Sequence, residues 1–187
     1  MDDIVRQAMQ KWPAVPACYG WLGLDKRGDW YLRDAHAQAA GAFQSGVPGA
    51  KGSRLEHAGL IAFIERNYAC DDRGFWYFQN GPQRVFVELE AAPWILRISP
   101  DYRMKTHDGR DLSAWQLVID AQGWLFAVTE RGLALLHSQD MVLAADAIET
   151  RAWPVEEMPS HVAGADGIAQ HYGFVRSPAQ GMTGLSL

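Results

Sequence analysis

The sequence predicts an α+β fold, in which a predominantly antiparallel β-sheet of hairpins and a meander carries two to four short helices. Three observations support this class. The stretch Arg73–Glu90 has the pattern of a β-hairpin, three strand-like runs follow one another between residues 114 and 137, and the helical patterns are short and set apart from the strands. Clustered strands with segregated helices are typical of α+β proteins. A chain of 187 residues supplies one domain with its own core, which we expect over residues 1–175.

The predicted hairpin turns at Asn80-Gly81, between two runs of aromatic and β-branched residues. Asn and Gly both tolerate the positive φ that a type I′ turn needs, so we expect a two-residue loop there. That loop places Tyr77 opposite Arg84 and Phe75 opposite Phe86. Because side chains alternate across a strand, one face of the hairpin is apolar and carries Trp76, Phe78, Val85, Val87 and Leu89. The other face carries Phe75, Tyr77 and Phe86 together with Arg84, Glu88 and Glu90.

Upstream of the hairpin, the sequence predicts two helices, two strands and a long loop. Residues 3–12 have an apolar helical stripe, which Pro13 ends. Strand patterns follow at residues 19–24 and 30–33. Residues 34–52 are mainly Ala, Gly and small polar residues, which bury little, so we expect a flexible loop. Ser53-Arg54-Leu55-Glu56 has the spacing of a capping box and predicts a helix that runs to about Asn67.

Downstream of the hairpin, the sequence predicts a strand, a polar loop, a meander and a short helix. The strand covers residues 93–98 and the polar loop covers residues 99–112. The meander follows, with its three strands at residues 114–119, 124–129 and 133–137. A helix capped by Asp140 is expected to run through Ile148. The end of the chain, residues 176–187, has the composition of a disordered tail.

One turn pattern, Asp-x-x-Gly, occurs at Asp25, Asp71 and Asp120. Asp at the first turn position bonds backbone amides ahead of it, and Gly relieves strain at the last position. Two interpretations are open: antiparallel strands that reuse one favourable turn, or a duplicated structural unit. The first is favoured, because the spacings of 46 residues (25 to 71) and 49 residues (71 to 120) bring no further sequence similarity.

Composition and charge exclude several classes of function. The formal net charge of −5, without a run of Lys or Arg, argues against nucleic-acid binding. No apolar run approaches the ~20 residues that a membrane-spanning helix needs, and the N-terminus lacks the apolar core of a signal peptide. Cys18 and Cys70 are too few and too far apart for a zinc site, so we expect free thiols in a cytoplasmic protein, with a disulfide between them as the alternative.

Residues 61–90 resemble a family of small bacterial proteins of unknown function. The resemblance rests above all on RNYACDDRGFWYFQNGPQRVFVELE, with the pattern RNYxxDxxGxWxFQNGPQRVxVxLE, and on GWLGLDKRGDWYLR upstream. It extends over most of residues 20–150. The resemblance implies a cytosolic bacterial protein, and it carries over no catalytic residues.

The candidate catalytic residues are His107 and Asp108, in the polar loop 99–112. An imidazole held by a carboxylate acts as a general base in many hydrolases, which makes a small hydrolase the alternative function. The competing interpretation is an Asp-Gly turn beside an exposed His. No metal site and no cofactor are expected, because no second His or Cys lies at ligand spacing and no nucleotide-binding or hydrolase motif occurs.

The favoured function is a non-catalytic binding or interaction domain that uses the second hairpin face. Its candidate binding residues are Phe75, Tyr77, Arg84 and Phe86. Large apolar side chains exposed beside charges usually mark an interface, here for a protein partner, a second copy of the chain or a small ligand. The competing interpretation places this face in the core. A polar set around the hairpin end, able to bind an anion or a peptide carboxylate, comprises Arg66, Asn67, Asn80, Gln83 and Arg84.

Overall fold

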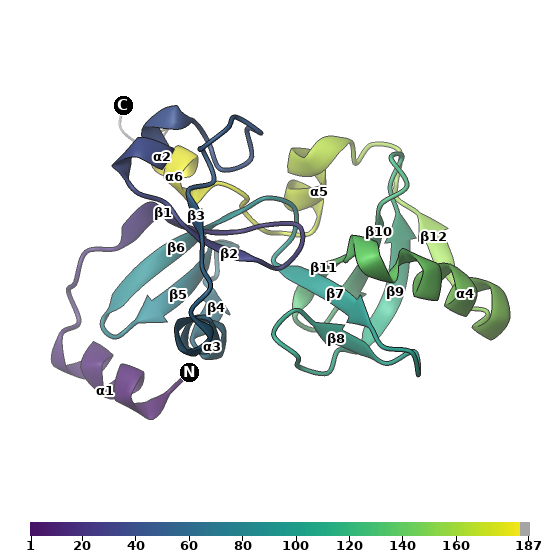
Figure 1. Ribbon diagram of the computed structural model, residues 1–187, viewed down its shortest axis with the longest axis horizontal. Helices are drawn as coiled ribbons and strands as arrows, with labels where there is room; N and C mark the ends of the chain where they lie inside the picture. The colour runs from purple at the N-terminus through teal and green to yellow at the C-terminus, as the bar shows by residue number, and fades with distance from the viewer. Residues whose placement is uncertain (184–187) are drawn as a thin grey trace. The chain divides into compact units, whose positions relative to one another are not determined.

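The computed structural model describes residues 1–183 of the chain, and it confirms the α+β fold class. Two six-stranded sheets are present, each built mainly from antiparallel pairs. The chain divides into two compact units, one around each sheet (Figure 1). Unit 1 comprises residues 1–25 and 29–90 and the segment from Gly173 onward, and unit 2 comprises residues 26–28 and 91–172. The single domain expected over residues 1–175 is thus organised as two units.

The sheet of unit 1 has the strand order β3-β2-β1-β6-β5-β4. Its strands are β1 (Cys18–Leu24), β2 (Trp30–Leu32), β3 (Ser53–Arg54), β4 (Tyr68–Cys70), β5 (Trp76–Asn80) and β6 (Gln83–Leu89). β1 and β6, which are far apart in the sequence, pair in parallel at the centre, and the other neighbours are antiparallel. One face of this sheet carries buried core residues, among them Leu22, Leu24, Trp30, Phe78 and Val87.

The β5–β6 hairpin forms where the sequence predicts it, but its register differs from the expected one by two residues. Asn80 pairs with Gln83, so the two-residue loop is Gly81-Pro82. Gly81 has φ 56°, whereas Asn80 is not among the residues of positive φ. This corrects the predicted type I′ turn, since positive φ at the first central residue alone is typical of type II′. Pro82 fits the second central position of this turn, because its ring fixes φ at a negative value, which a type I′ turn at Gly81-Pro82 would not allow.

Because the register shift is an even number of residues, every side chain of the hairpin keeps its predicted face. Tyr77 pairs with Phe86 in place of Arg84, and Phe78 pairs with Val85. The apolar face and the mixed face are therefore the ones that the sequence predicts.

Helices α1 (Asp3–Lys11), α2 (Ala35–Ala40), α3 (Ala58–Arg66) and α6 (Pro178–Thr183) belong to unit 1. The capping box expected at Ser53-Arg54-Leu55-Glu56 does not form, because Ser53 and Arg54 pair with β2 as strand β3. His57 is the N-cap of α3 instead, and its Nδ1 accepts the Leu60 N–H at 3.1 Å. The ring of Phe63 on α3 meets Phe78 edge-on, with centroids 5.4 Å apart, so α3 packs on the apolar sheet face.

Residues 34–52 are more structured than their composition suggests. Residues 35–40 form α2, whose N-cap Asp34 accepts the Ala37 N–H at 2.8 Å. Phe43 and Ala50 are 0% and 1% exposed. This corrects the expectation that the segment buries little, and the flexibility of the rest of the loop stays a prediction.

The C-terminal segment of unit 1 runs beside β6. The Val175 N–H donates to the Gly74 carbonyl at 3.0 Å, and the Leu89 N–H donates to the Arg176 carbonyl at 2.8 Å. The tail expected to be disordered from residue 176 therefore starts with hydrogen-bonded residues and includes α6. Residues 184–187, the end of that predicted tail, lie outside the described part of the chain.

The sheet of unit 2 has the strand order β12-β9-β10-β11-β7-β8. Its strands are β7 (Trp94–Ile98), β8 (Met104–Thr106), β9 (Ala114–Ile119), β10 (Leu125–Thr129), β11 (Gly132–Leu136) and β12 (Val155–Glu157). The pairs β7–β11 and β9–β12 are parallel and the others antiparallel. A 3₁₀ turn η1 (Ser138–Asp140) leads into α4 (Met141–Arg151), and α5 (Gly164–His171) follows β12. The predicted meander is β9–β10–β11.

The two units repeat one topology. In unit 1 it runs through β1, β2, β4, β5 and β6, and in unit 2 through β7, β8, β9, β10 and β11. Each unit begins with a hairpin and continues with a meander, and the last meander strand pairs in parallel with the first hairpin strand. The meander registers coincide: Tyr77 pairs with Phe86, and Phe126 pairs with Leu135, each 49 positions later.

The Asp-x-x-Gly turns at Asp71 and Asp120 occupy equivalent places in the two meanders. The Oδ1 atom of Asp71 accepts the N–H groups of Arg73 and Phe75, both at 3.0 Å. The Oδ1 atom of Asp120 accepts the N–H groups two and four residues on, at 2.9 and 2.8 Å. The repeated topology accounts for the turns at Asp71 and Asp120. The Asp25 turn joins β1 to β2, outside the two meanders, and its Oδ1 atom accepts the Asp29 N–H at 2.9 Å, so the favoured interpretation, reuse of one favourable turn, still applies there.

Candidate functional site

His107 and Asp108 follow β8 in unit 2, and each side chain contacts nearby backbone or side chains of the turn. The Nδ1 atom of His107 accepts the Ile95 N–H at 3.3 Å, and the imidazole lies 5.6 Å from the Trp94 ring. The Asp108 carboxylate accepts the Thr106 hydroxyl and pairs with the Arg110 guanidinium at 3.0 Å. These contacts hold the turn in place and favour a structural role over a catalytic one. His107 is not exposed, which corrects that part of the turn interpretation.

The protonation state of His107 also argues against a catalytic role. Burial lowers the pKa of His107 to about 4, an effect that the Asp108 carboxylate opposes. The imidazole is therefore neutral at pH 7, and its Nε2 atom is shielded from solvent. A general base works best when its pKa lies near the working pH, so His107 is poorly tuned for that task.

The described residues form neither a metal site nor a reactive thiol. Among the described residues, no group of three or more His, Cys, Asp or Glu side chains is placed to hold a metal ion. Cys18 and Cys70 are both free. Cys70 is exposed as a whole residue, but partial desolvation of its thiol, with smaller contributions from Asp71 and Asp72, raises the pKa of Cys70 to about 11. Since the thiolate is the nucleophilic form, Cys70 is a poor nucleophile at neutral pH.

The second face of the hairpin is an aromatic layer within unit 1. Tyr77 and Phe86 are 7% and 2% exposed, and Phe75 is half-buried. Tyr19 of β1 stacks on Phe86 with ring centroids 4.6 Å apart. Phe75 and Tyr77 each meet Phe86 at a steep angle, with centroids 5.9 Å apart. The rings therefore pack mainly against one another, and the open apolar surface suggested by the sequence is limited to their margins.

Two arginines lie over this layer. We call the whole set the arginine–aromatic face, and it consists of Tyr19, Phe75, Tyr77, Phe86, Arg73 and Arg84. The Arg84 guanidinium lies 4.7 Å from the centroid of the Tyr77 ring, and the Arg73 guanidinium lies 4.6 Å from that of Phe75. Both arginines are exposed. The arrangement brings the four predicted binding residues together and adds Arg73 and Tyr19, which sequence reasoning missed.

The two arginines differ in their partners. Arg73 is paired with Asp71, its Nη2 atom lying 2.9 Å from Oδ2. Arg84 forms no ion pair with any carboxylate in the part of the chain that the structure describes. Stacking on an aromatic ring holds a guanidinium in place and leaves the N–H groups at its edge free to donate. Arg84 is thus an exposed cation beside the Tyr77 ring, with no carboxylate partner among the described residues.

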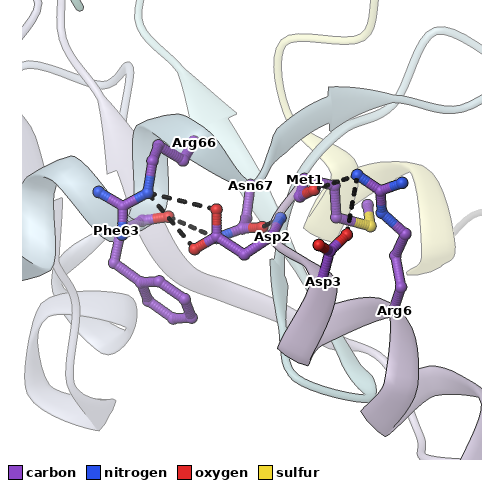
Figure 2. A network of polar contacts seen from close by, with 7 residues as sticks. All are labelled: Met1, Asp2, Asp3, Arg6, Phe63, Arg66 and Asn67. Carbon is purple, nitrogen blue, oxygen red and sulfur yellow. Dashed lines mark hydrogen bonds and ion pairs between the residues drawn. The ribbon is translucent and has the colours of Figure 1, made fainter.

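Arg66 and Asn67, which the sequence placed in a polar set with Arg84, have a different role (Figure 2). The Asn67 Oδ1 atom accepts the backbone N–H of Asp2 at 2.8 Å, and its amide donates to the Phe63 carbonyl at 2.9 Å. The Arg66 guanidinium lies 3.3 Å from the Asp2 carboxylate. Hydrogen bonds from Arg66 and Asn67 lower the pKa of Asp2. This network ties the N-terminus to the end of α3.

Unit 1 also contains two buried charged residues whose hydrogen-bond partners the sequence did not predict. Arg33 and Glu88 are 4% and 1% exposed. The Arg33 guanidinium donates to backbone carbonyls at 2.6 to 3.4 Å, which belong to Gly20, Ala37, Gly41 and Ala50. Glu88 accepts the Ser177 hydroxyl at 2.6 Å and the Ala179 N–H at 3.1 Å. Both residues hold distant segments together, and no local sequence pattern could reveal such partners.

A surface depression of about 430 Å³ lies in unit 1, where β1, β2 and β3 meet the loops beside them. It is lined by Trp21, Leu32, Arg33, Asp34, Gly52 and Ser53. Trp21 and Leu32 are 48% and 46% exposed. This size falls within the range of small-molecule pockets. Sequence reasoning missed the depression because its lining comes from separate stretches of the chain.

A family model named DUF2944, described as "Protein of unknown function (DUF2946)", matches residues 1–179. No curated protein matches the chain. The chain is similar to two crystal structures of DUF1285 family proteins. One, from Silicibacter pomeroyi DSS-3, is 12% identical, with 78% of this chain and 84% of that chain covered and a TM-score of 0.48. The other, from Shewanella baltica OS155, is 15% identical, with 67% and 91% covered and a TM-score of 0.44.

Within the described residues, no helix has the length and apolar character required to cross a membrane.

Proposed function

We propose that this chain, which belongs to the DUF2944 family of proteins of unknown function, is a non-catalytic binding domain that recognises an acidic group through Arg84. One observation carries the proposal: the exposed Arg84 guanidinium is held over the Tyr77 ring and meets no carboxylate in the described chain. The Tyr77 ring beside the guanidinium packs against Phe86, which also contacts Phe75. Arg73 is the second cation of the arginine–aromatic face.

Packing of the rings next to Arg84 favours binding, because less conformational entropy is lost when the recognising group is already ordered. Phe86 is nearly fully buried and contacts Tyr19, Phe75 and Tyr77, so the ring beneath Arg84 is itself fixed. A guanidinium presents two parallel N–H donors that match the two oxygens of a carboxylate. The ligand class is therefore a carboxylate, and we assign it to an acidic segment of a partner protein.

Because the whole chain is negatively charged, recognition of an acidic group depends on direct contacts and not on long-range attraction. At a formal net charge of −5, long-range attraction does not draw acidic ligands to the protein. Binding then depends on the few donors that contact the acid group, so loss of one arginine has a large effect. This is the property that the experiment below measures.

The alternative function, a small hydrolase acting through His107 and Asp108, has less support. Its general base would be an imidazole whose pKa is about 4 and whose Nδ1 atom accepts a backbone N–H. A bacterial, cytoplasmic setting remains part of the proposal. The free thiols of Cys18 and Cys70 support it, since disulfides are rare in that compartment.

The test is binding of a fluorescein-labelled hexaglutamate peptide, followed by fluorescence anisotropy at about 50 mM salt, where charge pairs are weakly screened. We expect Arg84→Gln to weaken binding at least about tenfold, because a hydrogen bond to a charged group contributes about 1.5–3 kcal/mol. The matched control is Arg54→Gln, which removes the same charge from β3 of the same unit. Arg54 is similarly exposed and pairs with Asp29 at 2.7 Å.

Three outcomes would contradict the proposal. The first is that hexaglutamate does not bind to the wild-type protein. The second is that Arg54→Gln and Arg84→Gln weaken binding equally, which would indicate an unspecific charge effect. The third is that a labelled hexaglutamine peptide binds as well as hexaglutamate. Melting curves of both variants check the fold, since loss of the Arg84–Tyr77 contact should cost only about 0.5–1 kcal/mol.

A further inference from the structure

The outer edge of strand β9 in unit 2 is covered by a strand from later in the chain. β12 lies parallel to β9, with Val155 opposite Leu117, Glu156 opposite Val118 and Glu157 opposite Ile119 (Figure 1). Val155 is half-buried, whereas the two glutamates are exposed. The Glu156 carboxylate also accepts the Gln116 amide at 2.7 Å. Three residues of an extended segment thus complete this sheet.

The repeat identifies the equivalent edge of unit 1. Leu117, Val118 and Ile119 correspond to Tyr68, Ala69 and Cys70, which lie 49 positions earlier and form the whole of β4. The correspondence is one of register, since Tyr68 pairs with Phe78 and Leu117 pairs with Ala127, both shifted by 49. β4 is the last strand of its sheet, and no counterpart of β12 follows it among the described residues.

The hydrogen bonds of β4 show which backbone groups face outward. Gln79 N–H donates to the Asn67 carbonyl, and Asp71 N–H donates to the Phe75 carbonyl. The odd-numbered residues 67, 69 and 71 therefore face β5, because backbone groups alternate along an antiparallel strand. The N–H and carbonyl of Cys70 face the opposite way, at the edge, and Cys70 is exposed. Exposed edge groups of this kind are templates for pairing with another strand.

We propose that the edge of β4 binds an extended segment of a partner protein, added in parallel as β12 is added to β9. The repeat also defines the chemistry of the segment. An apolar side chain lies opposite Tyr68, as Val155 lies opposite Leu117, and two polar side chains follow opposite Ala69 and Cys70. Backbone hydrogen bonds supply the affinity in this mode of recognition, and alternate side chains supply the specificity. The inference rests on the strand register and is independent of Arg84.

The probe is a synthetic peptide with residues 152–160 of this chain, AWPVEEMPS, which contains β12. We expect Cys70→Pro to weaken peptide binding at least tenfold, because proline has no N–H to donate at the edge. Proline is tolerated on edge strands where the N–H faces solvent, so the fold should persist. The matched control is Cys70→Ala, which removes the thiol and keeps the N–H, and it should bind as the wild-type protein does.

A second pair of probes keeps the test independent of protein folding. One peptide is N-methylated at Val155 and the other at Glu156, so that in one of them the methyl group faces the partner strand and in the other it faces away. Only one of the two should lose binding. Equal affinity for both peptides, or equal binding by the Cys70→Pro and Cys70→Ala variants, would overturn the proposal. Self-association of the wild-type protein that Cys70→Pro abolishes, without peptide binding, would assign the edge to a second copy and would also overturn it.

Discussion

The ring of Phe43 lies directly against the backbone of Gly23, where a Cβ atom would stand 2.5 Å from the ring carbon Cε2. Phe43 is 0% exposed and also meets Tyr31, with ring centroids 5.8 Å apart. A residue from the segment with loop-like composition thus packs on the central strand β1, and it does so because Gly23 has no side chain. Close packing of this kind leaves no room for even one added carbon.

Gly23→Ala should therefore destabilise unit 1. The added methyl group would force the buried Phe43 ring to move, and overpacking of a core costs about 1–3 kcal/mol. The measurement is thermal or urea unfolding. Gly167→Ala in α5 is the control, because the nearest atom to a Cβ there is 3.8 Å away. It should leave stability unchanged or raise it slightly. Equal melting temperatures for Gly23→Ala and the wild-type protein would mean that Phe43 is not packed as described.

Phe43→Ala tests the same contact by removing the ring in place of adding a methyl group at Gly23. Removal of a fully buried Phe side chain costs about 3–5 kcal/mol, which is a large part of the stability of a typical domain. Val47→Ala, in the same segment but 46% exposed, should change stability by less than about 0.5 kcal/mol. The expectation from composition is that both variants are tolerated. Unfolding curves decide between the two views.

The hairpin turn provides a further test. Gly81→Ala should destabilise the protein by about 1–2 kcal/mol, because φ is 56° at this position and a Cβ is strained there. Asn80→Ala should be nearly neutral, because Asn80 is paired with Gln83 and does not have positive φ. A type I′ turn centred on Asn80-Gly81 would make Asn80→Ala costly as well, so unfolding free energies of the two variants distinguish the turns.

The buried imidazole of His107 should make unit 2 sensitive to acid. Burial lowers its pKa from 6.5 to about 4 in the folded protein. Between these values the unfolded chain binds more protons, so the free energy of unfolding falls as the pH falls. The stability is fully present above about pH 6.5 and is lost progressively towards about pH 4, with a total of about 3 kcal/mol.

His107→Gln should flatten this part of the stability curve, measured as melting temperature at half-unit steps from pH 7 to about 4. The control is His36→Gln, at an exposed position in α2. It should retain the acid sensitivity of the wild-type protein. The assignment would be refuted by a His107→Gln variant that loses stability over this pH range as steeply as the wild-type protein does.

The sequence by itself determined the features that depend on local chemistry. The faces of the hairpin followed from the alternation of side chains along a strand, and a register error of two residues left them unchanged. The Asp-x-x-Gly turns were visible because the Asp side chain bonds amides only two and four residues away. Most strands and the α+β class followed from the same short-range patterns. The four candidate binding residues lie together, as the alternation predicts, because one face of one hairpin carries them.

Only the tertiary structure decided the features that depend on partners far away in the chain. The burial of Phe43 requires β1, and the pairing of β1 with β6 joins residues more than sixty positions apart, such as Leu22 and Val87. The turn at Gly81-Pro82 was chosen by strand pairing together with the fixed φ of proline. The repeat of one topology in two units was hidden because strand order and register survive when side chains change. Backbone hydrogen bonds define those properties, and composition does not record them.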